Sequence, residues 1–357
     1  MRPNAVGLTA VLAIASGVFA EPGDAQANRA GRDFAAEIEA ALRSAKEAAG
    51  FDHLGTLNRI CLLPDRGGAA STNDNVPRYV TDPSAAPPRA SWYADPARVF
   101  DNLYFVGGSV HSAWALVTSE GIIIIDTIYP YNSEELIVGG LRRLGLDPAD
   151  IRYVIISHAH GDHIGGAEML QERYGARVVM GAADWDTVER YPNRYRSMAP
   201  TRDIVATDGM EITLGNTTVT LWETPGHTEG TLSYTFTVLD DGRPVNVVYS
   251  GGTAFNFPNN TPDPGIRNFQ TYIDPQRHLA EQAARTGVTV LLSNHSEFDN
   301  AVDKNLMLAG WRSLNALGAA AGPHPYVNGT ESIARYFQVM QGCARAAQLG
   351  LERQLMM

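Results

Sequence analysis

The spacing of apolar positions predicts alternating strands and helices from Val99 to about residue 300. The runs "VFDNLYFVGG" and "SAWALVTSEGIIIIDT" have the apolar character and the glycine turns of paired strands. The stretch "SEELIVGGLRRLGL" has helical spacing that stops at Gly145 and Pro148, and "IRYVIIS" is a continuous apolar run typical of a buried strand. Strands that alternate with helices predict an α/β protein whose sheets are covered by helices.

The same alternation continues toward the C-terminus. We expect a helix at about 163–174 and two hairpins, in "MEITLGNTTVTLWETPG" and "LSYTFTVLDDGRPVNVVYSGG". A helix in "DPQRHLAEQAARTG" and a strand in "VTVLLSNH" follow, and the tail, 301–357, is expected to be helical and packed on the core. Long loops are expected at 127–133, 191–203 and 253–272.

The first 27 residues have the pattern of a signal peptide. Arg2 precedes the apolar run "AVGLTAVLAIASGVFA", and small residues suit cleavage after Ala20 or after Ala27. A membrane anchor is the alternative, but a span needs roughly 20 apolar residues and this run is shorter. We therefore expect a periplasmic or secreted protein with no stable membrane span once the signal is removed.

Residues 28–98 differ in composition and in apolar pattern from the region that follows. They begin with the helical pattern "DFAAEIEAALRSAKEA" and then become rich in Pro, Gly, Ser and Asn, which favours irregular structure. We expect an N-terminal extension, 28–98, that wraps a core domain at 99–300. The 357 residues carry a net charge of −11, which argues against a nucleic-acid-binding surface.

Only two cysteines occur, Cys61 and Cys343. An oxidising compartment permits one disulfide between them, and the alternative is two buried free thiols. Because no C-x-x-C occurs, a cysteine zinc site and a thioredoxin-type motif are excluded.

The segment "VIISHAHGDHIGG", 154–166, concentrates metal-binding side chains directly after an apolar strand. His158, His160, Asp162 and His163 lie on the loop where the strand gives way to a helix, with Gly161 at the turn. Imidazole and carboxylate are ligands of zinc and similar ions, so we interpret the loop as a metal site. A solvated histidine-rich turn is the alternative.

Two further histidines stand at strand ends. His227 follows a strand in "WETPGHTEGTLSY", and His295 follows one in "VTVLLSNHSEF". Alone, each would be an ordinary hydrogen-bonded histidine. Because strand ends deliver side chains to one crevice of an α/β sheet, the two together predict additional ligands.

The H-x-H-x-D-H loop, the T-P-G-H-T segment and the late strand that ends in His resemble the metallo-β-lactamase superfamily over about 99–300. The resemblance implies an αββα four-layer sandwich with the metals at one edge between its two sheets. It also implies that one zinc is held by His158, His160 and His227, and a second by Asp162, His163 and His295. An enzyme with a single ion is the alternative.

One position departs from the pattern of many relatives. A strand-end motif similar to "GDT" often supplies a bridging Asp or a ligating Cys, but here the matching stretch is "YSGGTAF", with Gly252 at that position. A histidine-rich second site without that ligand is similar to the third subclass of zinc β-lactamases, which are exported.

The resemblance implies a hydrolase in which a zinc-bound hydroxide attacks a carbonyl, with Asp162 orienting the nucleophile and Asp126 orienting a ligand. Asp126 alternatively caps a turn. The most similar subclass opens cyclic amides of the β-lactam type, which would bring antibiotic resistance. A zinc lactonase or esterase is the alternative, and a non-catalytic metal-binding protein a third. We expect a small-molecule substrate, and the oligomeric state stays open.

Five residues are proposed to contact the substrate, and the alternative is that their side chains only pack against the protein. They are His111, Tyr129, Tyr131, Phe257 and Arg267.

Overall fold

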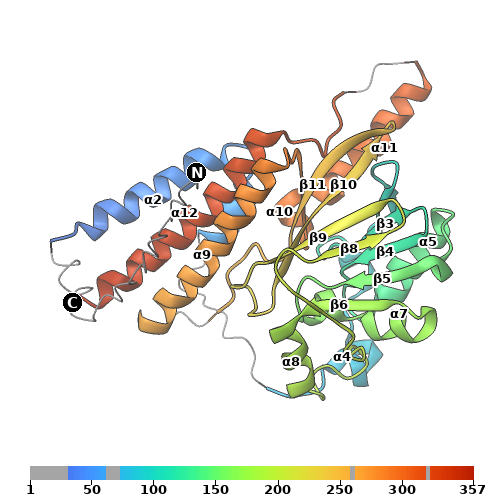
Figure 1. The fold of residues 1–357 in the computed structure, drawn as a ribbon, viewed down its shortest axis with the longest axis horizontal. Coiled ribbons are helices and arrows are strands. Elements are labelled where there is room, and N and C mark those ends of the chain that lie inside the picture. Colours follow the sequence, from blue (N-terminus) through green and yellow to red (C-terminus); the bar gives the residue numbers. More distant parts are fainter. Residues whose placement is uncertain (1–30, 62–72, 258–261, 319–321) are drawn as a thin grey trace, which may run out of the picture.

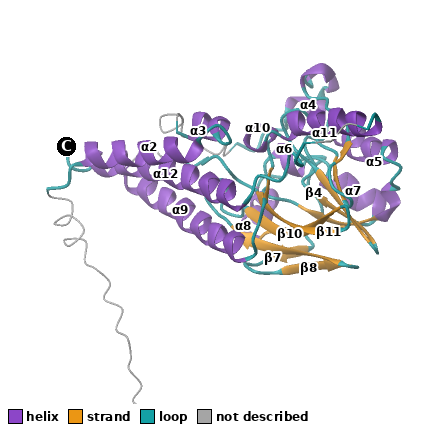
Figure 2. Cartoon of the chain, turned by 90° about the horizontal axis from the view of Figure 1, so that it is seen from above, coloured by secondary structure: helices purple, strands orange, loops and turns teal. Residues whose placement is uncertain are grey.

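The structure is a computed structural model that describes residues 31–61, 73–257, 262–318 and 322–357. The expected signal peptide, 1–27, lies outside the described residues. Two sheets form the centre of the fold, with helices on their outer faces (Figures 1 and 2).

The first sheet has seven strands in sequence order. It is antiparallel from β1 to β4 and parallel from β4 to β7. All four isoleucines of β4 are buried, as expected for a strand that is covered on both faces. The strands are β1 (Ala97–Arg98), β2 (Leu103–Phe105), β3 (Trp114–Thr118), β4 (Gly121–Ile125), β5 (Ile151–Ile155), β6 (Arg177–Gly181) and β7 (Ile204–Ala206).

The second sheet has five strands in the order β12-β11-β10-β9-β8. The two expected hairpins supply β8 to β11, and β12 pairs parallel with β11. The strands are β8 (Glu211–Leu214), β9 (Thr217–Glu223), β10 (Leu232–Asp240), β11 (Arg243–Ser250) and β12 (Val290–Ser293).

Three apolar clusters show how the layers pack. Leu116 and Ile123 of the first sheet share one cluster with Leu221 and Tyr234 of the second, so the sheets face each other. A second cluster joins the outer face of the first sheet to its helices, and a third joins the second sheet to the long helices. The expected αββα sandwich is therefore confirmed.

The helices cover the two outer faces. Those of the first sheet are α5 (Gly139–Arg143), which a π-helical turn (Glu134–Val138) precedes, α6 (Gly161–Ile164), α7 (Ala167–Tyr174) and α8 (Ala182–Arg190). Later in the chain come α10 (Ser296–Asp299) and α11 (Ala301–Ala316).

Three long helices, α2 (Phe34–Ala49), α9 (Pro262–Arg285) and α12 (Thr330–Gln354), lie side by side and extend beyond the sheets (Figures 1 and 2). Both described ends of the chain are thus helical, as expected, and the two ends pack against each other. A disulfide joins Cys61, at the end of α3 (Leu54–Ile60), to Cys343 in α12. In the described parts of the chain, no helix combines the length and the apolar character needed to cross a membrane.

Two segments differ from the predicted loops. The helix α9 begins at Pro262, so the second half of the loop expected at 253–272 is helical. Proline is tolerated in a first helical turn, and the buried Phe269, Tyr272 and Ile273 supply the packing that fixes the helix. The edge strand β7 was also not predicted, because three residues are too few to show a period.

The N-terminal extension contains more regular structure than predicted. Beyond α2, the stretch expected to be irregular contains α3, α4 (Arg78–Thr81) and the 3-10 turns Pro83–Ala85 and Arg89–Ser91. A third such turn, Pro148–Asp150, precedes β5. Each turn with proline at its start uses the fixed φ of that residue.

Candidate metal centre

The histidines singled out in the sequence meet at one edge of the two sheets. His158, His160, Asp162 and His163 follow β5 and enter α6. His227 lies in the turn between β9 and β10, and His295 lies between β12 and α10. These segments are up to about 140 residues apart in the chain, so it is the sheet topology that brings them together.

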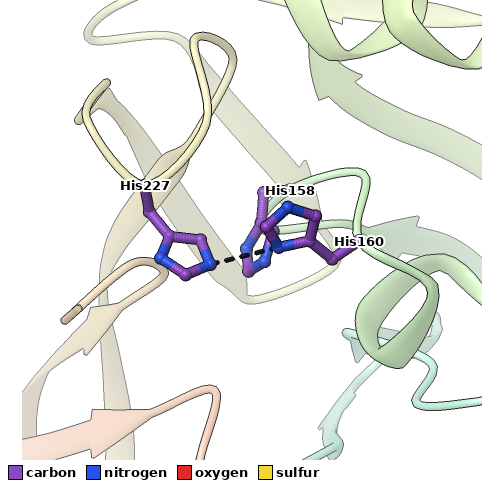
Figure 3. Close-up of side chains that lie close together, drawn as sticks. All are labelled: His158, His160 and His227. Carbon is purple, nitrogen blue, oxygen red and sulfur yellow. Dashed lines mark hydrogen bonds between the residues drawn. The ribbon is translucent and has the colours of Figure 1, made fainter. Parts of the chain in front are cut away.

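The first group consists of His158, His160 and His227, each of which offers one side-chain nitrogen that lies within 4.8 Å of those of the other two (Figure 3). Nδ1 of His160 is 3.1 Å from Nε2 of His227. Nε2 of His158 is buried and has no hydrogen-bond partner among the described residues. A buried nitrogen without a partner costs free energy, so this donor set fits a bound cation.

In two of these rings, the outer nitrogen is held by a carbonyl oxygen. Nδ1 of His158 lies 2.9 Å from the oxygen of Gly251, and Nδ1 of His227 lies 2.5 Å from that of Ala254. A carbonyl oxygen can only accept a hydrogen bond, so in these two rings the proton is on Nδ1 and the Nε2 lone pair faces the centre.

Burial keeps these imidazoles neutral. It lowers the pKa of His160 to about 4 and that of His227 to about 3, and it holds the pKa of His158 well below its usual value. At neutral pH each of the three rings therefore keeps one nitrogen unprotonated, with its lone pair available, which is the protonation state that metal binding requires.

The second group surrounds Asp162. Its Oδ2 lies 3.3 Å from Nε2 of His163, 3.3 Å from Nε2 of His295 and 3.3 Å from Nε2 of His111. Nε2 of His163 is also 3.2 Å from Nε2 of His295. The structure thus brings together the three residues expected at the second site and adds His111, which the sequence suggested only as a substrate contact.

Asp126 supports this group from behind. Its buried carboxylate accepts hydrogen bonds from the Ser157 amide (2.7 Å), the Ser157 hydroxyl (2.8 Å) and the Tyr249 hydroxyl (2.6 Å). Its Oδ2 also lies 3.1 Å from Nδ1 of His163. This placement fits the predicted orienting role, because it fixes the ring so that Nε2 faces Asp162.

The second group needs a positive charge. Burial alone would raise the pKa of Asp162, but His163 and His295 beside it hold that pKa well below its usual value. Burial would likewise lower the pKa of His163, yet Asp162 and Asp126 raise it to about 10. A proton on His163 or a divalent cation among these groups satisfies the buried carboxylates.

Comparisons with known proteins place this site in a family. Residues 106–283 match the family model "Metallo-beta-lactamase superfamily". A subclass B3 metallo-β-lactamase of Bradyrhizobium japonicum is 26% identical, with a TM-score of 0.53, and the match covers 74% of this chain and 96% of that one. This chain belongs to the metallo-β-lactamase superfamily.

The match to this chain covers nearly all of some superfamily relatives and only a part of others. A metallo-β-lactamase of Cronobacter sakazakii is 27% identical, with a TM-score of 0.57, over 75% of this chain and 97% of that one. A hydroxyacylglutathione hydrolase of Pseudomonas putida is 33% identical over 29% of this chain, and the match spans only a third (33%) of that protein. Membership makes this protein a metallo-β-lactamase superfamily hydrolase, of a family that uses zinc.

Gly252 is the residue that the sequence resemblance matched to the bridging Asp of many relatives. A Cβ at that position would lie 2.6 Å from Cβ of His227 and 2.8 Å from Cγ2 of Thr231. The glycine therefore leaves room for His227, and any side chain there would displace a candidate ligand.

Asp184, in the first turn of α8, was not identified from the sequence. Its carboxylate accepts hydrogen bonds from the amides of Ala159 (2.7 Å) and Gly230 (3.1 Å) and from the hydroxyl of Thr228 (2.8 Å). It thus ties the first histidine loop to the loop of His227. Burial raises the pKa of Asp184 to about 6. Nothing in the spacing of "AADWDTVER" distinguishes it from a solvated Asp.

A cavity of about 510 Å³ opens beside the first group. Its wall combines apolar or aromatic side chains with two guanidinium groups on and after α8. It is lined by residues that include His160, His227, Asn256, Phe257, Tyr191, Tyr195, Arg190 and Arg194.

The predicted substrate contacts are placed differently from one another. Phe257 lines the cavity, whereas Arg267 is exposed on α9 and is not among the lining residues described. Tyr129 and Tyr131 stack on each other with ring centroids 5.0 Å apart, and Tyr79 of the N-terminal extension packs edge-on against both. This aromatic cluster lies beside the second group, where the Tyr129 ring is 5.0 Å from that of His111.

Proposed function

We propose that the protein is an exported hydrolase that uses two zinc ions to open a cyclic amide of the β-lactam type. The first ion would be held by His158, His160 and His227, and the second by Asp162, His163 and His295. The observation that carries the proposal is a histidine-rich double site without a bridging carboxylate at position 252. Gly252 has no side chain, and His227 and Thr231 lie too close to it for any side chain to fit there. The match to two β-lactamase structures, which covers 96% and 97% of those chains and 74% and 75% of this one, supports it.

Zinc, when bound, lowers the pKa of a coordinated water to about 7, so that hydroxide is available near neutral pH. The residues of this chain do the rest. The Gly251 and Ala254 carbonyls hold His158 and His227 in the metal-binding tautomer. The ionised Asp162 carboxylate accepts a hydrogen bond from the attacking water and so directs its lone pair at the carbonyl carbon.

The cavity beside His160 and His227 supplies the binding site for substrate. Phe257 and Tyr191 provide apolar wall, and Arg190 and Arg194 provide positive charge. Guanidinium groups recognise carboxylates through paired hydrogen bonds, so a partly apolar substrate that bears a carboxylate is complementary to this wall. We expect Arg190→Ala to raise KM about tenfold with little change in kcat, as for uniform binding.

Export is proposed from the apolar N-terminal run and from the Cys61–Cys343 disulfide, which an oxidising compartment maintains. We also propose three parts for the mature chain: an extension at 28–98, a catalytic domain at 99–300 and a helical tail at 301–357.

A zinc lactonase or esterase is the second candidate. An N-acyl homoserine lactonase of Bacillus is 26% identical over 177 residues, which is 43% of this chain and 68% of that protein. A lactone presents the same kind of carbonyl to the same site.

Hydrolysis assays separate the two candidates. Mature, zinc-loaded protein is tested on a penicillin, a cephalosporin, a carbapenem and an acyl lactone, beside chelator-treated protein, Asp162→Ala and the distant control His278→Ala. Chelator-sensitive β-lactam turnover that Asp162→Ala loses and His278→Ala keeps supports the proposal. Hydrolysis of the lactone alone favours the second candidate. No hydrolysis of any of the four substrates contradicts both candidates.

A further inference from the structure

His111 approaches Asp162 as closely as two expected ligands do. Its Nε2 is 3.3 Å from Oδ2 of Asp162, the distance that His163 and His295 also show. The ligand atoms of His111, Asp162 and His295 all lie within 4.8 Å of one another. One carboxylate oxygen therefore has three imidazole nitrogens around it, although the expected site accounts for only two.

The main chain fixes His111 in this place. His111 and His295 form an antiparallel bridge, and the hydrogen bonds on either side join Ser112 N to Asn294 O (2.8 Å) and Ser296 N to Val110 O (2.8 Å). The loop before β3 is thus attached to the segment that presents His295. A histidine at 111 is placed by the same backbone pairing that places an expected ligand.

Neighbouring rings fix the orientation of the side chain. The His111 ring packs edge-on against Tyr129, with centroids 5.0 Å apart, and against His295, with centroids 4.9 Å apart. Only 21% of the side chain is exposed. Nε2 is therefore held toward Asp162 rather than toward solvent.

We propose that His111 is a further ligand of the second metal ion, which would then be held by three imidazoles and one carboxylate. The inference rests on the proposed two-ion site. Zinc with four protein ligands is coordinatively closed, whereas zinc with three keeps a position for water. The coordination position open to water would then belong to the first ion, which His158, His160 and His227 would hold beside the cavity. The second ion would contribute its positive charge and would fix the position of Asp162.

Metal binding tests this without reference to turnover. Purified protein is stripped with a chelator, and Zn²⁺ is titrated in competition with a chromophoric chelator for the wild type, His111→Ala, His111→Gln and the control His278→Ala. We expect the wild type and the control to bind two ions. In both His111 variants the first ion should bind unchanged and the second at least about tenfold more weakly, since even outer-sphere partners contribute 10- to 100-fold.

His111→Gln separates a ligand from a positioning residue. Its amide can still donate a hydrogen bond to Asp162 but is a poor zinc ligand. Wild-type affinity for the second ion in His111→Gln, or in His111→Ala, overturns the inference and leaves the proposed function intact. A wild type that binds a single ion overturns both the two-ion site and this inference.

The wild type alone gives an independent measurement. In Co²⁺-loaded protein, each ligating imidazole contributes one hyperfine-shifted, exchangeable N–H proton resonance. We expect three such protons from the first site and three, rather than two, from the second. Two from the second site would overturn the assignment even if the variants failed to fold.

Discussion

Nδ1 of His163 donates a hydrogen bond to Oδ2 of Asp126 across 3.1 Å, inside a region where both side chains are fully buried. The same carboxylate also accepts hydrogen bonds from Ser157, just after β5, and from Tyr249 of β11, so both segments fix the carboxylate that orients His163. The ring that faces Asp162 is therefore set by residues that have no contact with the proposed ion. Such outer partners orient a ligand and raise its basicity.

Removing the charge of Asp126 should weaken the second site. We expect Asp126→Asn to keep the fold, because the amide oxygen can still accept hydrogen bonds, but to lower zinc affinity at the second site by about 10- to 100-fold. Competition titration measures this, with Asp303→Asn, at an exposed position of α11, as the matched control. Unchanged affinity in a folded Asp126→Asn protein would contradict the role given to this carboxylate.

The smallest possible side chain at 252 should damage the first site. The methyl group of Gly252→Ala would stand 2.6 Å from Cβ of His227, so the loop that presents this histidine must shift. We expect weaker zinc binding at the first site and a loss of about 1–3 kcal/mol in unfolding free energy, the usual cost of overpacking. The control is Gly310→Ala, where a Cβ meets nothing within 4 Å. If Gly252→Ala and Gly310→Ala bind zinc at the first site with equal affinity, the steric explanation for Gly252 is wrong.

The candidate ligand loop could be identified from the sequence because its signal is local. His158, His160, Asp162 and His163 follow one apolar strand within six positions, and a buried strand has a pattern that the sequence displays directly. The two sheets followed from the same short apolar runs.

What could not be predicted depends on contacts between distant segments. Asp184 is buried because α8 packs beside the loop of Thr228 and Gly230, and its own neighbours in sequence carry no sign of that. The approach of His111 to Asp162 likewise arises from a backbone bridge between residues 111 and 295. Neither the spacing nor the composition of a single segment encodes such pairings.

His53 should make the protein less stable in mild acid. Its Nε2 donates to the carbonyl of Ser332 (2.8 Å), and its buried Nδ1 has no hydrogen-bond partner in the part of the chain that the structure describes. Burial lowers the pKa of His53, a shift that the nearby Asp52 opposes and Arg335 and Lys304 reinforce. The unfolded chain therefore takes up the proton first, and stability falls as the pH drops below about 6.5, the unfolded value.

We expect His53→Gln to remove this part of the pH dependence, because an amide can donate to Ser332 and does not titrate. Between about pH 6.5, the unfolded value, and the lower pKa of folded His53, the wild type should lose up to about 1.4 kcal/mol per pH unit relative to the variant. Urea unfolding at pH 7.5, 6.5 and 5.5 measures the difference, with His278→Gln, on the partly exposed α9 surface, as control. Parallel pH curves for the wild type and His53→Gln would refute the prediction.

The disulfide between Cys61 and Cys343 should stabilise the packing of the two ends of the chain. It joins residues 282 positions apart and fastens α3 to α12, which also packs on α2 and α9. A cross-link that closes so long a loop restricts the unfolded chain, and removal of a native disulfide commonly costs about 2–5 kcal/mol. We expect a reducing agent to lower the melting temperature of the wild type and to leave the already less stable Cys61→Ser/Cys343→Ser variant unaffected. A melting temperature that is the same with and without reductant, in protein whose bridge is shown to be reduced, would contradict this role.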